Sequence, residues 1–296
     1  MVHIPVLSEE VIAGLALEPD DVVLDATVNE GGHSSLIAKH LSTKGTIIGI
    51  DEDAEALAEA RANLRGVACT VILERDNFRN LDQVLLRHHI PSVNKVLLDI
   101  GLSSRQLDVS GRGFSFQKDE PLLMTFRSDP DTETLTAYEV VNRWKEESLA
   151  DVIYGFGGER FARRIARRIV EARKIKPIER TVELAELVRQ SIPRAYRFGK
   201  IHPATKTFQA IRIAVNDEFG ALKEGIEKAF EHLEQGGILA VIAFHSGEDR
   251  IVKNLFRDLA RLHTATIITK KPLVPSDDEV KHNPRSRSAR LRIIKK

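Results

Sequence analysis

Two predicted strands end in carboxylates, and a glycine-rich loop lies between them. Asp25 ends the apolar run 22–24, Gly31 and Gly32 follow in the loop, and Asp51 ends the apolar run 46–50. Glycines let the backbone turn sharply and approach a ligand, and a carboxylate placed like Asp51 can accept hydrogen bonds from both hydroxyls of a ribose. The spacing therefore predicts a nucleoside-cofactor cradle over residues 25–51.

The chemistry of this cradle favours a cationic cofactor over a dinucleotide. Asp25 would repel a phosphate but suits a cation, and the loop lacks the G-x-G-x-x-G spacing that seats a pyrophosphate at a helix N-terminus. S-adenosylmethionine, a sulfonium, is the preferred candidate, and NAD is the alternative.

Three further segments carry residues that could do chemistry, and each also has a structural interpretation. Residues 99–108 follow a predicted strand, at the end where parallel sheets bind ligands, but the Ser and Asp residues there could simply cap a turn. Residues 112–116 place two aromatic residues beside an arginine, which could stack an extruded base or pack in a core. His245 also follows a predicted strand, although a single histidine is usually structural.

These residues need a framework of alternating strands and helices. Apolar runs predict buried strands at 22–24, 46–50, 95–99, 237–244 and 264–269, and a helix is expected to begin at Ser34. Between about 110 and 200 the pattern is mostly helical, with helices expected at 136–144, 146–154, 159–174 and 181–191. The sequence thus predicts an α/β domain in two parts, 1–109 and 204–296, interrupted by a helical domain at 110–203 that we expect to recognise the substrate.

Composition excludes several classes of protein. The chain has 296 residues, of which 42% are hydrophobic, enough for one large or two modest domains. The single cysteine, Cys69, excludes an intramolecular disulfide framework and a Cys-rich zinc site. No metal-ligand pattern is evident, and no run is long enough to span a membrane, so we expect a cytoplasmic protein without a resident metal. The oligomeric state, monomer or homodimer, stays open.

The net charge of +1 hides two basic segments. Residues 281–296 contain seven Lys or Arg and no acid, which favours contact with nucleic acid. Residues 158–174 repeat arginines opposite an apolar helical face. That pattern fits either a solvated amphipathic helix or a phosphate-contacting surface.

Together the motifs resemble one family over nearly the whole chain. The chain is similar to the bacterial small-subunit ribosomal RNA cytosine-N4 methyltransferases of the MraW type. The matching segments are 3–7, the Gly-Gly-His-Ser loop at 31–34, 99–108, 112–116, 202–212, Phe244-His245-Ser246 and 283–288.

The resemblance implies a doubly wound, Rossmann-like S-adenosylmethionine-dependent methyltransferase fold with an inserted helical domain. It implies transfer of methyl to N4 of a cytidine in the decoding centre of small-subunit ribosomal RNA. By motif match, the cofactor would be contacted by Gly31, Gly32, His33, Asp51, Phe78, Asp99 and Gln106. Our hypothesis for catalysis is that Asp99, with Ser103 or Ser104, orients the amine and that His245 binds RNA or relays a proton.

The chain departs from the family pattern at three places. Asn29 stands where the family loop usually has Gly, residues 121–126 lack an Asp and an Arg that normally follow the first Leu, and Gly247 replaces a Leu. Asn tolerates a left-handed backbone, but its side chain could crowd the cofactor, and Gly247 is expected to loosen the loop that carries His245. Two alternatives therefore stay open: a catalytically impaired assembly factor that binds ribosomal RNA, and a nicotinamide-dependent oxidoreductase.

Overall fold

The computed structural model describes residues 5–199, 201–262 and 265–296, without the side chain of Ser104. His3, Ile4 and Thr264, which belong to segments discussed above, lie outside the described residues. The chain divides into two compact units, an α/β unit made of Met1–Gly101 with Phe219–Lys296, and a helical unit made of Leu102–Glu218.

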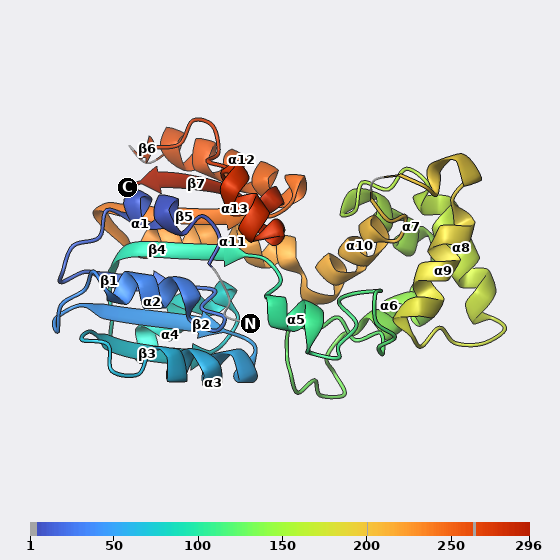
Figure 1. Ribbon diagram of the computed structural model, residues 1–296, viewed down its shortest axis with the longest axis horizontal. Helices are drawn as coiled ribbons and strands as arrows, with labels where there is room; N and C mark the ends of the chain where they lie inside the picture. Colours follow the sequence, from blue (N-terminus) through green and yellow to red (C-terminus); the bar gives the residue numbers. More distant parts are fainter. Residues whose placement is uncertain (1–4, 200, 263–264) are drawn as a thin grey trace. The chain divides into compact units, whose positions relative to one another are not determined.

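The α/β unit is built on a seven-stranded sheet with the order β3-β2-β1-β4-β5-β7-β6 (Figure 1). Its strands are β1 (Val22–Asp25), β2 (Thr46–Asp51), β3 (Thr70–Arg75), β4 (Val93–Ile100), β5 (Leu233–Ala243), β6 (Thr266–Ile267) and β7 (Arg290–Lys295). The first five run parallel, and β7 runs antiparallel to both β5 and β6. The strand order reverses between β1 and β4, which is the point where doubly wound sheets bind their ligands.

Alternate residues of each central strand enter two different cores, so both faces of the sheet are covered. On one face Leu24 and Ile48 pack with α4 (Leu81–Arg87), α11 (Glu218–His232) and α12 (Ser246–Leu262). On the other face Val23 and Ile47 pack with α1 (Ser8–Leu15) and α2 (Gly32–Ala38). The remaining helices of this unit are α3 (Ala54–Asn63), η1 (Phe78–Asn80), α13 (Asp277–His282) and η3 (Pro284–Ser288).

The predicted strands at 22–24, 46–50, 95–99 and 237–244 are confirmed, whereas β7 was missed. The sequence indicated only a basic tail there, yet Leu291 and Ile293 of β7 are buried in the core. Arg292 is buried as well and donates to Asp249 of α12 at 2.7 Å, and Arg290 donates to the same carboxylate at 3.1 Å. Two cations of the tail therefore hold a strand against α12, and the charge of the tail is in part structural.

The helical unit packs its own core. Its elements are α5 (Ser104–Asp108), α6 (Ala137–Arg143), α7 (Glu146–Gly155), α8 (Ala162–Arg173), α9 (Thr181–Ser191), η2 (Arg194–Tyr196) and α10 (Thr205–Asn216). The helices expected at 136–144, 146–154, 159–174 and 181–191 correspond to α6 to α9. Phe208 and Ile211 of α10 belong to this core, so the unit extends to Glu218 instead of ending at 203, and it begins at Leu102 instead of 110.

Two sequence segments find structural roles inside the helical unit. Arg112 and Phe114 are buried, and Phe116 stacks on His202 with ring centroids 4.5 Å apart, so residues 112–116 pack in a core. Leu122 and Met124, from the segment 121–126 that differs from the family pattern, are buried in that core. The packing interpretation of residues 112–116 is therefore the one that the structure favours.

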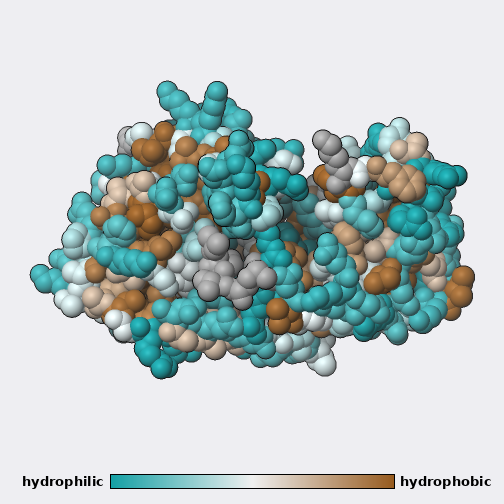
Figure 2. Space-filling view, in the orientation of Figure 1, coloured by the Kyte–Doolittle hydropathy of each residue, from teal (hydrophilic) through white to brown (hydrophobic). Residues whose placement is uncertain are grey.

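Figure 2 shows a largely hydrophilic face on which apolar residues form separate patches. Within the described residues, no helix combines the length and the hydropathy needed to cross a membrane.

Candidate active site

Acidic side chains stand at the carboxyl ends of three neighbouring parallel strands. Asp25 ends β1, Asp51 ends β2 and Asp99 lies one residue before the end of β4. Because β1 pairs with both β2 and β4, with Asp25 opposite Gly49 and Leu97, the three carboxylates share one edge of the sheet. This is the edge at which open α/β sheets bind ligands.

The loop after β1 is fixed by hydrogen bonds to both neighbouring strands. The amide of Ala26 donates to Leu97 O at 2.9 Å, and the amide of Val28 donates to Ile50 O at 3.0 Å. Gly31 has a φ of 80°, and a Cβ placed there would lie 3.3 Å from the Cα of Ala60 in α3. Its lack of a side chain therefore serves both the left-handed turn and the close approach of α3. α2 begins at Gly32, two residues earlier than predicted.

Asp25 is buried and held by the helix that follows the loop. Its Oδ2 accepts a hydrogen bond from the hydroxyl of Ser34 at 2.6 Å. Burial raises the pKa of Asp25, the Ser34 bond and the nearby His33 lower it, and the charge of Asp99 raises it. Because the net effect is a raised pKa, burial disfavours the charged form of Asp25, and a cation bound nearby would stabilise it.

His33, which is buried, and Asp99, which is partly buried, form a pair whose hydrogen-bonding capacity is not fully used. His33 Nε2 lies 3.5 Å from Asp99 Oδ2, and neither ring nitrogen of His33 nor Asp99 Oδ1 has a hydrogen-bond partner among the described residues. The backbone of Asp99 is fixed, since its amide donates to the hydroxyl of Thr27 at 2.6 Å. Buried polar atoms without partners are costly, so these atoms mark a place where a ligand would supply the missing hydrogen bonds.

Asp51 is half-buried and receives a backbone amide on each oxygen. Asp53 N donates to Oδ1 at 2.9 Å and Asn29 N donates to Oδ2 at 3.0 Å. Burial raises the pKa of Asp51 to about 7, against the lowering effect of these bonds. Each carboxylate oxygen has a second lone pair, so Asp51 keeps the capacity to accept from two ribose hydroxyls.

Asn29 adopts the left-handed backbone that its replacement of a glycine requires, with a φ of 46°. Its side-chain amide donates to Thr27 O at 3.1 Å, so the side chain is tied back to its own loop. The sequence did not predict that Thr27 would bind the backbone of Asp99 or that the amide of Asn29 would donate to Asp51. The signal was present as polar residues spaced two apart directly after a buried strand.

Phe78 lies in η1, beyond the end of β3, and is partly buried against the sheet's core. A Cβ on Gly225 of α11 would come within 2.5 Å of the Phe78 ring, so the ring rests directly on that helix. A fixed apolar ring near this edge suits the wall of an adenine site.

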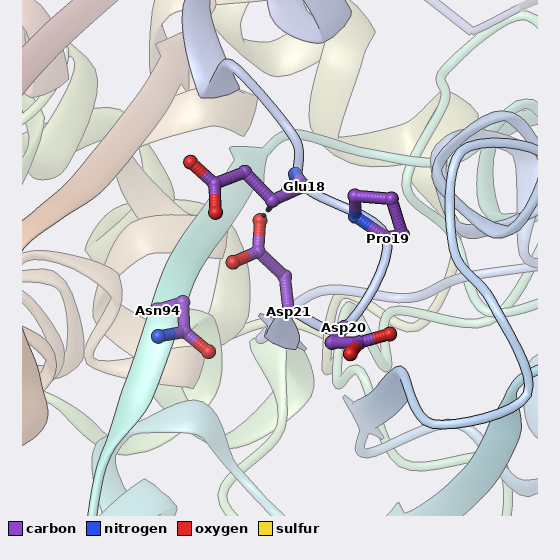
Figure 3. A pocket seen from close by; sticks show the side chains of 5 residues that line it. All are labelled: Glu18, Pro19, Asp20, Asp21 and Asn94. Atoms are coloured by element: carbon purple, nitrogen blue, oxygen red, sulfur yellow. Dashed lines mark hydrogen bonds between the residues drawn. The ribbon is translucent and has the colours of Figure 1, made fainter.

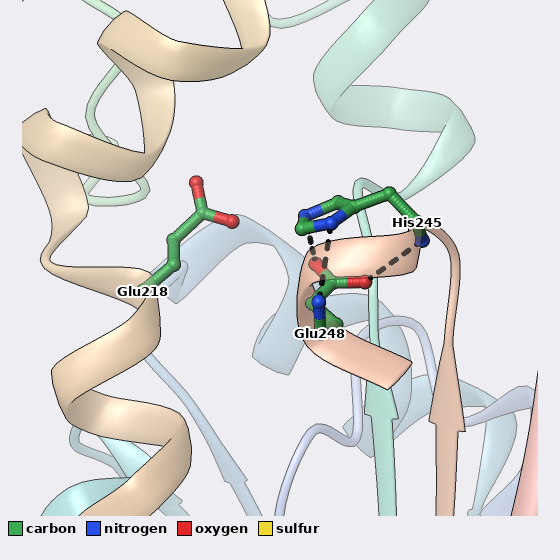
Figure 4. Close-up of side chains that lie close together, drawn as sticks. All are labelled: Glu218, His245 and Glu248. Atoms are coloured by element: carbon green, nitrogen blue, oxygen red, sulfur yellow. Dashed lines mark hydrogen bonds and ion pairs between the residues drawn. The ribbon is translucent and has the colours of Figure 1, made fainter. Parts of the chain in front are cut away.

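His245 follows β5 and is held by Glu248 (Figure 4). Its Nε2 lies 2.8 Å from Glu248 Oε1, and its Nδ1 accepts from Glu248 N at 3.2 Å. The other oxygen of Glu248 accepts from the amides of Phe244 and His245 at 2.8 and 3.2 Å. Both ring nitrogens therefore face one residue in the first turn of α12, an arrangement that fixes the ring's position.

Gly247 does not leave the loop without an anchor. Any Cβ there would lie 2.8 Å from the Phe219 ring and 3.1 Å from His245 Nδ1, and Phe219 packs on His245 with centroids 5.7 Å apart. Phe219 thus occupies the space that a leucine side chain would need. Glu218, the first residue of α11 and the third side chain of Figure 4, receives two hydrogen bonds of 2.7 Å from Arg212. Because the Glu218 carboxylate is already paired with Arg212, we propose no metal site at Glu218, His245 and Glu248.

Ser103 and Gln106 belong to the helical unit, where they bond to each other. Ser103 Oγ accepts from Gln106 N at 3.1 Å, and Gln106 Oε1 accepts from Ser103 N at 3.0 Å. This pair forms a capping box at the start of α5, which is the turn-capping interpretation of residues 99–108. The Ser104 side chain lies outside the described residues, and the catalytic role predicted for the two serines stays a prediction.

A hollow of about 320 Å³ lies at the opposite edge of the sheet (Figure 3). Its lining residues are Glu18, Pro19, Asp20, Asp21 and Asn94, next to the amino ends of β1 and β4. Asp21 there pairs with Lys95 at 3.7 Å. The hollow lacks the residues of the cradle and is separate from it.

The residues of the cradle fit S-adenosylmethionine. The unpartnered atoms of His33 and Asp99, the buried carboxylate of Asp25 and the acceptor pair on Asp51 provide hydrogen bonds and negative charge. Such a set matches a ligand with a ribose and a positive sulfonium, and no group in it would bind a pyrophosphate.

The fold and this cradle together define the chain as a Rossmann-like methyltransferase. The model of the MraW methylase family matches residues 1–296, and the chain belongs to that family. S-adenosylmethionine is the cofactor that this membership indicates.

Two relatives are similar in sequence to this chain over nearly their whole lengths. The chain is 48% identical over 294 residues to ribosomal RNA small subunit methyltransferase H of Persephonella marina, covering 99% of each chain. It is 46% identical to the protein of that name from Synechococcus elongatus, covering 99% of this chain and 94% of the relative. A solved structure of a rRNA methylase from Streptococcus thermophilus gives a TM-score of 0.45 at 13% identity, covering 100% of this chain and 98% of that chain.

Proposed function

We propose that this protein transfers a methyl group from S-adenosylmethionine to the exocyclic N4 of a cytidine in the decoding centre of small-subunit ribosomal RNA. The observation that carries the proposal is the partly buried Asp99, whose buried Oδ1 has no partner among the described residues and whose backbone is fixed by Thr27. The printed names of the relatives support ribosomal RNA of the small subunit as the substrate class.

N4 of cytosine is a poor nucleophile because its lone pair is delocalised into the ring. When bound, S-adenosylmethionine supplies an electrophilic methyl group on a positive sulfur. Asp99 then has two tasks: its free oxygen accepts a hydrogen bond from the amine and orients the lone pair, and it takes the proton that the methylated nitrogen releases. His33, 3.5 Å from Asp99, lies where it can hold the second carboxylate oxygen.

His245 acts in this proposal as a positioning residue. Its Nδ1 is occupied by the amide of Glu248, and its Nε2 lies 2.8 Å from a Glu248 oxygen without forming a hydrogen bond. Its contacts hold the chain between β5 and α12 in one conformation. We expect loss of the ring to affect RNA binding and local stability more than the chemical step.

The deciding experiment is transfer of labelled methyl from S-adenosylmethionine to small ribosomal subunits that lack the modification, with naked RNA alongside. The product nucleoside is identified by mass spectrometry. N4-methylcytidine on the subunits is the expected result. Bound cofactor without any transfer would contradict the proposal and favour a catalytically impaired assembly factor.

A set of variants then assigns the roles. Asp99→Asn should lower kcat by about 10²-fold or more, the range for a positioned acid or base. Because Asp99 also belongs to the cofactor cradle, kcat is measured at saturating S-adenosylmethionine. His245→Ala should mainly raise KM for subunits. Asp20→Asn, an exposed carboxylate away from the cradle, is the matched control and should behave like wild type. Near-normal turnover of Asp99→Asn would show that the assignment is wrong.

A further inference from the structure

The segment between α9 and α10 of the helical unit exposes two aromatic side chains. Tyr196 is 53% exposed and Phe198 is 80% exposed, whereas Phe114 and Phe208 of the same unit are buried in its core. Tyr154 of α7 is exposed as well. Exposed aromatic rings close together in the chain often mark a binding surface. The core of the helical unit does not account for these two.

The Tyr196 ring is held in place while much of it stays exposed. The guanidinium of Arg160 lies 3.9 Å from the centroid of the Tyr196 ring and 4.8 Å from that of Phe161. The two rings are themselves 5.5 Å apart. Arg160 and Phe161, which directly precede α8, therefore fix the tyrosine as a rigid platform, and little ordering is needed when a planar ligand stacks on it.

The surroundings of this platform are positive. Residues 187–216 contain six Lys or Arg and no Asp or Glu, and two of the six, Arg189 and Arg212, pair with Glu186 and Glu218 at 2.7 Å. In the first turns of α8, Arg163 and Arg164 are exposed, and among the described residues neither has an acidic partner. Further along α8, Arg167 and Arg168 pair with Glu146 and Glu171 at 3.6 and 3.1 Å. The two arginines without an acidic partner are thus those nearest in sequence to Arg160.

We propose that Tyr196 and Phe198, with Arg160, Arg163 and Arg164, form a surface that binds single-stranded RNA. Bases stack on the two rings, and the arginines neutralise phosphates. Single strands fit because their bases are open to stacking, whereas a duplex hides both faces of every base. The charge favours a polyanion over a protein partner. The inference rests on the proposed function for its substrate class and adds the surface that holds the RNA.

The test measures binding of the full-length chain to a fluorescein-labelled single-stranded RNA decamer by anisotropy, and to the same sequence as a duplex. Removing one base stack should weaken binding by about 5- to 150-fold, so we expect Tyr196→Ala with Phe198→Ala to fall in or above this range. Tyr196→Trp should retain affinity because it keeps a stacking ring. Ile175→Ala, which changes a residue of the same unit that is 91% exposed, is the matched control and should bind like wild type.

The arginines have a separate readout. Arg163→Ala with Arg164→Ala should lower the slope of log affinity against log salt by about 1.4, or about 0.7 for each phosphate that is no longer neutralised. Unchanged single-strand affinity in the double aromatic variant would overturn the proposal, as would equal binding of the duplex. If the double aromatic variant binds RNA as tightly as wild type but methylates subunits poorly, the proposal is also overturned, and the surface instead contacts a ribosomal protein.

The RNA-binding measurement can fail or succeed independently of the methyl-transfer assay. If the wild-type chain transfers no methyl but loses RNA affinity in the aromatic variant, the proposed reaction fails and the RNA surface stands. If methyl transfer occurs and the aromatic variant binds RNA normally, the reaction stands and the surface is wrong.

Discussion

The carboxyl group of Asp51 should make cofactor affinity depend on pH near neutrality. Burial raises its pKa from 3.8 to about 7, and only the carboxylate is a strong acceptor for ribose hydroxyls. With this pKa the carboxylate makes up about 9% of the group at pH 6 and about 91% at pH 8. If only the carboxylate binds, the Kd for S-adenosylmethionine should tighten about 10-fold between these two values.

Isothermal titration calorimetry of wild type and of Asp51→Asn at pH 6, 7 and 8 measures this effect. The ligand's own titration is common to both proteins, so the difference between their profiles belongs to Asp51. Asp51→Asn should bind more weakly than wild type at pH 8 and should lack the 10-fold gain, which is about 1.4 kcal/mol.

Thermal unfolding gives a second readout with a defined sign. The carboxyl group of Asp51 has a pKa of about 7 in the folded protein and 3.8 in the unfolded chain, so the folded state binds its proton more tightly. The contribution of Asp51 to stability therefore falls as pH rises from about 4 to about 7. The Tm of Asp51→Asn relative to wild type should therefore rise from pH 5 to pH 8. Parallel pH profiles of the two proteins in calorimetry would refute the reasoning about the pKa, and equal affinity at pH 8 would refute the ribose contact.

Three other substitutions test contacts that support the site. Asp249→Ala leaves the buried Arg292 without its partner and should cost about 3–5 kcal/mol of unfolding free energy in urea denaturation. Thr27→Val removes the acceptor for the amide of Asp99 and should cost about 1–3 kcal/mol together with a fall in kcat, whereas Thr27→Ser should keep both. Gly225→Ala drives a Cβ into the aromatic ring beyond β3 and should weaken cofactor binding in calorimetry, while full affinity would show that this ring does not line the adenine site.

The sheet was predictable where burial makes every residue of a strand apolar, as in residues 22–24 and 46–50. β7 was not, because Arg290 and Arg292 alternate there with apolar residues, and counting the charge of the tail hid that alternation. Arg290 and Arg292 are adjacent on one face of the strand and share one carboxylate 41 and 43 residues earlier in the chain, a pairing that no local pattern encodes. The sequence also could not show that α10 belongs to the helical unit, since an apolar helical face does not indicate which core it packs into.

The site shows the same division between local and distant information. The carboxylates at the strand ends were predictable because parallel strands present their carboxyl ends at one edge. The capping roles of Ser103 with Gln106 and of His245 with Glu248 could also have been predicted, since both pairs have the three-residue spacing that brings side chains back to a helix's first amides.

What the sequence could not show is which polar atoms are left without partners after folding. Among the described residues that set is confined to a few side chains. It includes Nε2 of His245, but only His33 and Asp99 contribute such atoms side by side at the carboxyl edge of the sheet. Because leaving such atoms buried costs free energy that a structural role would not justify, their position is the strongest physical reason to place the chemistry at Asp99.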